Sequence, residues 1–272
     1  MRVGCVEIER MGLLQLKSYL NSFSSYKDEN ILKSWSDDDP KSDCCNWERV
    51  KCSDDIGGHT VGLSLYEIMF DSNFYQPHGF NLTLLHSFPQ LKTLNFSYNW
   101  CDHLFDPIHG YKSFQKLEKL ETLDLSRNNF NNSVLPFLSA ARSLRILNLR
   151  SNSLEGVFHP NGLINFKELE VLDLSNNNIN DFEAGDGLIK SKLKTLHLSG
   201  IRFSDTALLK GLEHLVELEV LSLAYNQFNH TRAYQVLKDM PKLQELDLTG
   251  NGFTDLDSLG KMMIKREKLA CS

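Results

Sequence analysis

The chain has 272 residues, of which 41% are hydrophobic and 24% charged, and its formal net charge is -6 at pH 7. These fractions are those of a folded protein and exclude a wholly disordered chain. The acidic balance argues against nucleic-acid binding, which needs a basic face to displace counterions from phosphates. No apolar run approaches the ~20 residues of a membrane helix, so we expect no membrane span in this chain.

Residues 1–60 are predicted to form an amino-terminal cysteine cap. Apolar side chains such as Ile8 and Met11 recur at helical spacing, which predicts a helix over Glu7–Leu20. A second short helix is expected over Ile31–Trp35. Together these segments would shield one end of the fold.

Four of the six cysteines lie in this cap, at Cys5, Cys44, Cys45 and Cys52. The adjacent pair cannot readily bond to each other, and four cysteines allow three connectivities. A zinc site is the alternative, but Cys45 and Cys52 have six residues between them, which fits zinc-ligand spacing poorly. Disulfides are therefore favoured and indicate an oxidising compartment, although the first residues show no apolar secretory signal. We expect Cys101 to be a buried apolar side chain and Cys271 to be a tail thiol.

Residues 61–90 are predicted to form an irregular first repeat. Val61–Leu65 is the expected first strand, and the rest is rich in aromatic residues. We expect these aromatics to fill the core; the alternative is a partly exposed patch for a partner.

Residues 91–255 carry seven copies of the template L-x-x-L-x-L-x-x-N-x-L, at spacings of 24 to 29 residues. This is the leucine-rich-repeat signature, and it predicts an α/β solenoid. Short strands stack into a parallel sheet on the concave face, while irregular or short helical segments cover the convex side. Residues 256–272 are expected to be a degenerate C-terminal tail.

The ninth position of the template is an asparagine, whose amide can pair with backbone groups that the turning chain leaves free. Ile201 takes this place in the fifth copy, where Gly200 is expected to let the backbone shift or admit water. The predicted asparagine ladder is Asn99, Asn128, Asn152, Asn177, Asn226 and Asn251.

The residue between the two strand leucines of each copy is expected to face solvent, because neighbouring strand residues point to opposite faces. This column is acidic or rich in amides, which would favour basic groups on a ligand; ordinary strand solvation is the alternative. The candidate concave binding surface is Asn95, Asp124, Asn148, Asp173, His197, Ser222 and Asp247. Side chains after the strands, such as Tyr98, Arg127 and Tyr225, adjoin it.

No catalytic, phosphate-binding or metal-binding motif stands out. His103 and His109 flank Asp106, and a solvated loop is favoured there over a metal site. We therefore expect no enzyme activity, no cofactor and no metal. Four N-x-S/T acceptors predict N-glycosylation, at Asn81, Asn95, Asn131 and Asn229.

The segment Cys44–Cys52, read with Cys5 and the helix before it, resembles the amino-terminal cap of plant extracellular leucine-rich-repeat proteins. Leu123–Asn128 and Leu172–Asn177 resemble their repeats. The strongest resemblance is to plant receptor-like proteins, of which this chain would be a truncated member. It implies the disulfides Cys5–Cys44 and Cys45–Cys52.

The resemblance also implies a location outside the cell or on the outer face of the plasma membrane. It further implies recognition of a protein, peptide or cell-wall-derived ligand in defence or development, with a co-receptor kinase as a second partner. Two alternatives remain: a secreted inhibitor of cell-wall-degrading enzymes, and an intracellular leucine-rich-repeat scaffold without disulfides.

Overall fold

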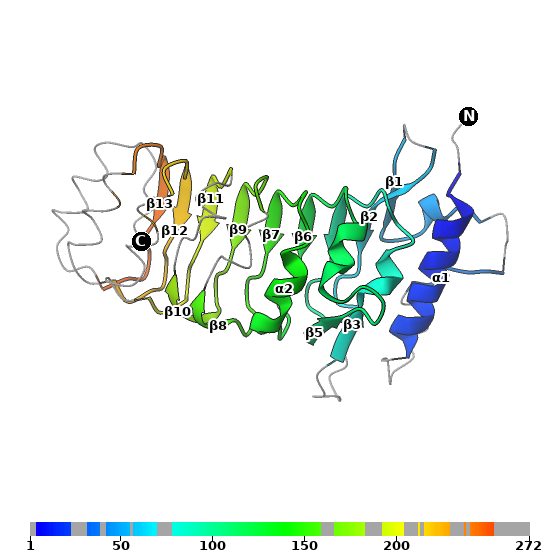
Figure 1. Cartoon of the computed structure of the whole chain (residues 1–272), viewed down its shortest axis with the longest axis horizontal. Coiled ribbons are helices and arrows are strands. Elements are labelled where there is room, and N and C mark those ends of the chain that lie inside the picture. The colour runs from blue at the N-terminus through cyan, green and yellow to red at the C-terminus, as the bar shows by residue number, and fades with distance from the viewer. Residues whose placement is uncertain are drawn as a thin grey trace.

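The protein is a right-to-left stack of short strands along one axis, with a helical cap at the amino-terminal end (Figure 1). This computed structural model describes residues 4–22, 32–38, 42–54, 57–69, 78–158, 166–182, 192–203, 212, 215–228, 237 and 240–252. A nine-stranded sheet runs through the described residues. Its strands, in spatial order, are β1 (Val50–Cys52), β2 (Thr60–Ser64), β4 (Thr93–Asn95), β6 (Thr122–Asp124), β7 (Ile146–Asn148), β9 (Val171–Asp173), β11 (Thr195–His197), β12 (Val220–Ser222) and β13 (Glu245–Asp247).

From β2 to β13 every neighbouring pair of strands is parallel and in matched register. The leucine at the centre of each strand lies opposite the leucine of the next, and these eight side chains are 0–5% exposed. No single three-residue strand could bury such a side chain alone, so stacking supplies the core. The predicted leucine-rich-repeat solenoid is confirmed.

The strand β1 is the one antiparallel member of this sheet, and the sequence did not predict it. Val50 lies opposite Leu63, and Cys52 opposite Thr60. The strand covers the outer edge of β2, whose backbone groups would otherwise be open to another chain.

The other side of the coil is built from short pieces. Two strand pairs lie there, β3 (His78–Asn81) with β5 (Cys101–Phe105), and β8 (Glu155–Phe158) with β10 (Asn178–Phe182). The described helical segments on this side are η2 (Leu82–Leu85), η3 (Gly110–Lys116), η4 (Asn132–Val134) and α2 (Leu135–Leu138). In the aromatic first repeat, Phe80 and Phe88 are buried as expected, whereas Tyr66 is exposed and does not fill the core. The other aromatics of this repeat, Phe70, Phe74 and Tyr75, lie outside the described residues.

The asparagines of the ladder link successive turns of the coil. The Nδ2 group of Asn128 donates to the carbonyl of Phe96 at 2.9 Å, and its Oδ1 accepts the N–H of Cys101 at 3.1 Å. Asn226 repeats this arrangement between the carbonyl of Leu198 and the N–H of Phe203. Each amide therefore satisfies backbone groups of both its own turn and the turn before.

At Ile201, which interrupts the asparagine ladder, the backbone has the same conformation as in the other repeats. Gly200 has φ of +67°, but Tyr98, Arg127 and Tyr225 have positive φ at the same place in other repeats. The expectation that Gly200 lets the chain shift is therefore wrong. Ile201 is buried, and its N–H still donates to Oδ1 of Asn226 at 3.2 Å.

The cap helix α1 (Glu7–Asn21) buries only the later part of the predicted apolar stripe. Leu16 and Leu20 of the stripe are buried together with Leu13, whereas Ile8 is 70% and Met11 45% exposed. This rotation also places Glu9 inside, where its carboxylate accepts the N–H of Thr60 at 2.5 Å and contacts His59 Nδ1 at 2.7 Å. A carboxylate buried at that place must keep these partners.

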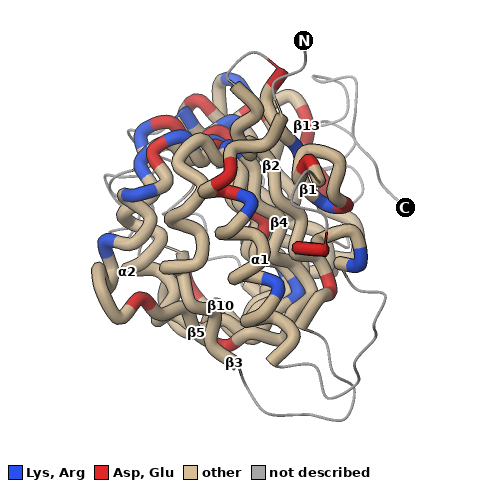
Figure 2. The backbone as a smooth tube through the Cα atoms, turned by 90° about the vertical axis from the view of Figure 1, so that its right-hand side faces the viewer, with Lys and Arg blue, Asp and Glu red and all other residues tan. Residues whose placement is uncertain are grey.

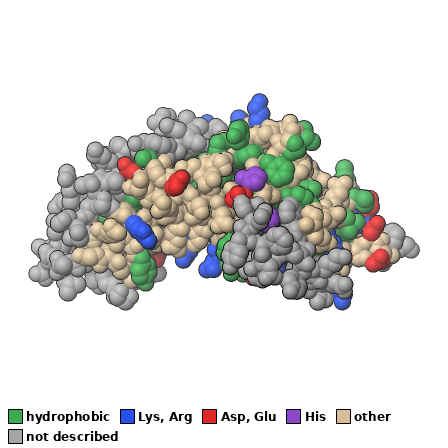
Figure 3. Space-filling model, turned by 90° about the horizontal axis from the view of Figure 1, so that it is seen from below, with side chains coloured by type: hydrophobic (Ala, Val, Ile, Leu, Met, Phe, Trp, Pro, Cys, Tyr) green, Lys and Arg blue, Asp and Glu red, His purple; other side chains and the backbone are tan. Residues whose placement is uncertain are grey.

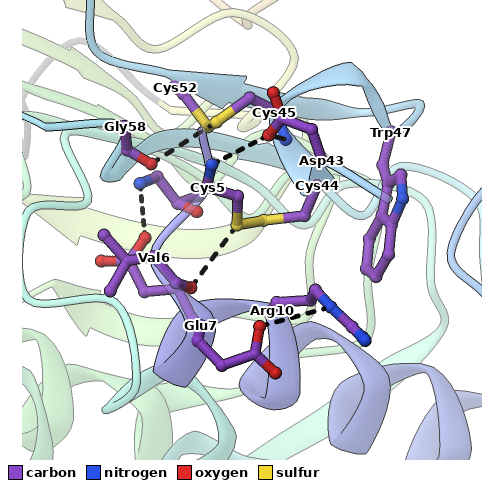
Figure 4. Close-up of a disulfide and its surroundings, with 12 residues drawn as sticks. Cys5, Val6, Glu7, Arg10, Asp43, Cys44, Cys45, Trp47, Cys52 and Gly58 are labelled. Carbon is purple, nitrogen blue, oxygen red and sulfur yellow. Dashed lines mark hydrogen bonds and ion pairs between the residues drawn. A yellow bond between two sulfur atoms is a disulfide. The ribbon is translucent and has the colours of Figure 1, made fainter. Parts of the chain in front are cut away.

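The four cap cysteines form disulfides Cys5–Cys44 and Cys45–Cys52, the pairing that the resemblance implies. Figure 4 shows Asp43 between them, where its Oδ1 accepts the N–H of Cys5 and the N–H of Cys45. The described part of the second expected helix, Leu32–Ser34, is a turn instead. There the N–H of Trp35 donates to the carbonyl of Leu32 at 3.0 Å, and Lys17 Nζ donates to the carbonyls of Leu32 and Trp35.

Opposite charges alternate along one edge of the coil, just before the strands (Figure 2). Arg145 pairs with Glu170 at 3.0 Å, and Lys194 pairs with Glu219 at 3.0 Å. Such exposed pairs contribute roughly 0–1 kcal/mol each. Of the helices within the described ranges, none has the length and apolar character needed to cross a membrane.

Candidate functional site

The predicted concave surface is a continuous column in the folded protein. Strand register places each member directly opposite the next, so that Asp124 faces Asn148, and Asp173 faces His197. Ser64 of β2 extends the column by one strand, opposite Asn95. All seven predicted side chains are half-buried between buried neighbours. The column thus presents polar groups on a rigid sheet.

Five of the seven column residues also close the turn that follows their own strand. Oδ1 of Asp124 accepts the N–H of Ser126 at 2.9 Å, and Oδ1 of Asp173 accepts the N–H of Ser175 at 2.8 Å. Asn95, Asn148 and Asp247 make the same bond two residues ahead. One oxygen of each carboxylate therefore closes a turn, which leaves the other oxygen of Asp124 and of Asp173 for contact with a ligand.

The three aspartates of the column form no ion pair with a basic side chain of the described residues. Oδ2 of Asp247 accepts a hydrogen bond from the hydroxyl of Ser222 at 3.2 Å. The column therefore presents three carboxylates that no basic side chain of the described residues neutralises by direct pairing.

An aromatic corner borders the column near the cap. Tyr66 stacks on Tyr98 with ring centroids 6.0 Å apart, and the guanidinium of Arg127 lies 5.9 Å from the Tyr98 centroid. Tyr66 is 41% exposed, so this corner offers an apolar and cationic surface beside the acidic column. The repeat template does not predict this corner, because Tyr66 and Tyr98 are not template positions and lie 32 residues apart in the chain.

Hydrophobic side chains also reach solvent on the side that carries β3 and β5, where histidines lie among them (Figure 3). The ring centroids of His103 and Phe105 are 5.9 Å apart there, and Phe105 is 37% exposed. These residues are away from the concave column.

Three of the four glycosylation acceptors are described, and each holds an asparagine turn. Oδ1 accepts the N–H of the sequon's own serine or threonine at Asn81, Asn95 and Asn131. Asn131 is exposed, whereas Asn81 and Asn95 are half-buried. Asn229 lies outside the described residues.

The expectation of a solvated loop around Asp106 is wrong. The Asp106 side chain is fully buried, and it contacts His109 and His86, while His103 pairs with Asp102 instead. The sequence analysis missed His86. It precedes His109 by 23 residues, close to one repeat, and this spacing is the signal that could have found it.

The pKa values of this cluster follow from its enclosure. Burial lowers the pKa of His86, and this effect outweighs the attraction of Asp106. For Asp106, burial alone would raise the pKa, but the N–H groups of His109 and Ile108 stabilise its carboxylate and hold the pKa below its ordinary value.

Comparison with known proteins identifies the building blocks of the chain. The family model "Leucine rich repeat N-terminal domain" matches residues 9–53. The models "Leucine Rich Repeat" and "Leucine Rich repeat" match residues 119–140, 168–187 and 239–256.

The curated proteins that the chain resembles include two receptor-like proteins of Arabidopsis thaliana. The chain is 54% identical to Receptor-like protein 1 over 168 residues, which is 60% of this chain and 15% of that protein. It is 47% identical to Receptor-like protein 9b over 165 residues, 61% of this chain and 16% of that protein. The resemblance to plant receptor-like proteins is confirmed, over a small part of their length.

Two solved structures share the fold. A plant ice-binding protein superposes with a TM-score of 0.59 at 24% identity, over 92% of this chain and 80% of its own. The ectodomain of the Arabidopsis receptor kinase HAESA, in complex with an N-terminally extended IDA peptide hormone, superposes with a TM-score of 0.59 at 21% identity. The match covers 96% of this chain and 44% of the HAESA chain. At these identities the likeness establishes the fold alone.

Proposed function

Because the cap and repeats of this chain match the leucine-rich-repeat ectodomain of plant receptor-like proteins, we propose that it is a non-catalytic recognition module acting outside the cell. Its ligand is a peptide or protein with basic groups, bound on the concave column in defence or developmental signalling. The observation that carries the proposal is the column itself, whose aspartates are unpaired among the described residues and aligned strand by strand.

Several features support this choice. A peptide laid along the sheet would meet a charged group on alternate strands, at Asp124 and Asp173, and then at Asp247. The solved HAESA ectodomain, a structure of the same fold, holds a peptide hormone. An anionic wall polysaccharide would be repelled by the same column, which favours a peptide over that class of ligand.

The disulfides support an oxidising location over the intracellular scaffold. Thiol titration of the denatured, unreduced chain separates the two readings. The proposed extracellular module gives two titratable thiols, since four of six cysteines are paired. Six thiols would favour the scaffold.

The binding test uses an array of synthetic lysine- and arginine-rich peptides, with acidic and neutral peptides on the same array. Asp124→Asn/Asp173→Asn/Asp247→Asn removes three charges and keeps each Oδ1, since Asn95 and Asn148 already make that turn bond. At ~0.5 kcal/mol for each exposed pair, the triple variant should bind basic peptides about tenfold more weakly.

The matched control, Glu118→Gln/Glu155→Gln/Glu168→Gln, removes three charges away from the column. It should retain wild-type affinity. Equal weakening in both triple variants would mean that net charge alone is sensed. If both triple variants bind basic peptides with wild-type affinity, the column is not the binding surface.

A further inference from the structure

We propose that His86, Asp106 and His109 form a binding site for a divalent transition metal ion, with zinc as the natural occupant. The site lies on the opposite side of the coil from the concave column and is independent of peptide recognition. The three residues come from separate segments: His86 follows η2, Asp106 follows β5, and His109 precedes η3.

The spacing of the donor atoms fits a metal ion. Oδ2 of Asp106 lies 3.6 Å from His86 Nε2 and 3.3 Å from His109 Nδ1, and all three atoms lie within 4.8 Å of one another. Ligands held at 2.0–2.1 Å from a tetrahedral zinc ion are roughly 3.3 Å apart. Two of the three separations are therefore near the required value before any adjustment.

Two of these atoms contact each other without a well-formed hydrogen bond. Asp106 Oδ2 and His109 Nδ1 are buried and accept or donate no hydrogen bond among the described residues. The Asp106 side chain is fully buried, and leaving a buried carboxylate oxygen without a partner is costly. A bound cation would satisfy both atoms at once.

The surroundings hold the donors in place. The other carboxylate oxygen of Asp106 accepts the N–H groups of Ile108 and His109 at 2.8 and 2.7 Å, which fixes its direction. Ser113 is buried, and its hydroxyl lies 3.0 Å from His86 Nε2. Because this hydroxyl lies beside the nitrogen that would hold the ion, it can approach the ion as a further ligand.

The donor set selects the kind of metal. Two imidazoles and one carboxylate favour zinc and its neighbours over calcium and magnesium, which take mostly oxygen ligands. The site lies close to solvent, because the His109 side chain is 30% exposed and lines a surface cavity of about 1060 Å³ with Ile108 and Tyr111.

The test titrates the full chain, free of any histidine tag and stripped with a chelator, with Co²⁺ and then Zn²⁺. We expect one equivalent of Co²⁺ with the visible absorption of a tetrahedral ion, displaced by Zn²⁺. His86→Asn, Asp106→Asn and His109→Asn should each weaken binding by more than ~100-fold, and Ser113→Ala by roughly 10- to 100-fold. His103→Asn is the matched control, since His103 lies in the same segment but pairs with Asp102, and it should bind normally.

A second measurement does not depend on variants that fold. In the wild-type chain, Zn²⁺ should protect His86 and His109 from diethyl pyrocarbonate, as read by peptide mass spectrometry, and should leave His103 reactive. Absence of saturable metal binding would overturn the proposal. So would equal affinity in Asp106→Asn and the control, or protection of all three histidines alike.

Discussion

Asn128 and Asn99 occupy the same position in successive repeats, and Oδ1 of Asn128 accepts the backbone N–H of Asn99 at 3.1 Å. The amide of Asn128 also donates to carbonyls of its own turn, at Leu125 and Ser126. One side chain thus joins two turns of the coil through buried backbone groups that water cannot reach.

Asn128→Ala should therefore destabilise the protein by about 3 kcal/mol, because it leaves several buried backbone groups unpaired at about 1–3 kcal/mol each. Urea unfolding measures the loss. Asn129→Ala is the control: Asn129 is exposed and donates only a 3.3 Å bond to the carbonyl of Trp100. A similar loss in both variants would show that the ladder contributes little.

Much of this fold could be predicted from periodicity. The register of Leu94, Leu123 and Leu147 followed from the template alone, because a repeated strand can bury its leucine only against its copies. The antiparallel strand β1 and the rotation of α1 could not, since both depend on single contacts such as that between Glu9 and Thr60.

The candidate sites divide in the same manner. The concave column was predictable, because it repeats with the template. The aromatic corner was not, because it joins residues that occur once and meet only when unequal loops are stacked. For the Asp106 cluster, the spacing of His86 and His109 was a signal, but the burial of Asp106 was not visible in the sequence.

The residue just before each ladder position has a left-handed backbone, so glycine there should make the protein more stable than a residue with a side chain. Ser151 has φ of +54°, where Gly200 and Gly250 occupy the corresponding place in other repeats. A left-handed backbone costs a side-chain-bearing residue about 1–2 kcal/mol. Ser151→Gly removes this strain from the folded state, but it also raises the conformational entropy of the unfolded chain, which offsets part of the gain. We therefore expect the free energy of unfolding to rise by about 0.5 kcal/mol.

The reverse change supplies the control. Gly200→Ala places a methyl group against Oδ1 of Asn176 in a backbone with φ of +67°. It should destabilise by at least ~1 kcal/mol in thermal or urea unfolding. Destabilisation by Ser151→Gly would show that this serine makes a contact worth more than the strain.

The two disulfides should differ in their contribution to stability. They close loops with sequence separations of 39 residues, for Cys5–Cys44, and 7 residues, for Cys45–Cys52. Loop-closure entropy gives about 4 kcal/mol for the longer loop and about 2 kcal/mol for the shorter. Paired alanine substitutions followed by urea unfolding measure both; an equal or reversed order would contradict this account.

The hydroxyl of Tyr19 should make the cap sensitive to alkali. It donates to the carbonyl of Gly79 at 2.8 Å, and burial raises its pKa from 10.0 to about 12. Because the folded state favours the neutral phenol, its contribution is complete below pH 10 and is lost as the pH rises through about 12.

Ultraviolet titration of tyrosinate should therefore show an ionisation near pH 12 that Tyr19→Phe removes. At neutral pH this variant loses two hydrogen bonds, the one that the hydroxyl donates to Gly79 and the one that it accepts from the N–H of Asn81, or about 2 kcal/mol. Tyr111→Phe is the control, since that ring is 59% exposed. Persistence of the late transition in Tyr19→Phe would assign it to another residue.

Glycosylation should favour Asn131 over Asn95. Asn131 is exposed in the loop before η4, so a sugar chain on its amide extends into solvent. Asn95 is half-buried in β4, and its Oδ1 accepts both the N–H and the hydroxyl of Ser97, at 2.9 and 2.6 Å. Glycopeptide mass spectrometry of protein secreted from plant cells should show higher occupancy at Asn131.

The outcome bears directly on the concave column, because Asn95 lies in it opposite Asp124. Ser97→Ala removes that acceptor motif while leaving the Asn95 side chain, and Ser133→Ala does the same for Asn131. If Asn95 is bare, Ser97→Ala leaves the mass of the secreted protein unchanged, whereas Ser133→Ala lowers it by one glycan. A loss of mass in Ser97→Ala would place a glycan over the first strands and confine ligand contact to the column from Asn148 onward.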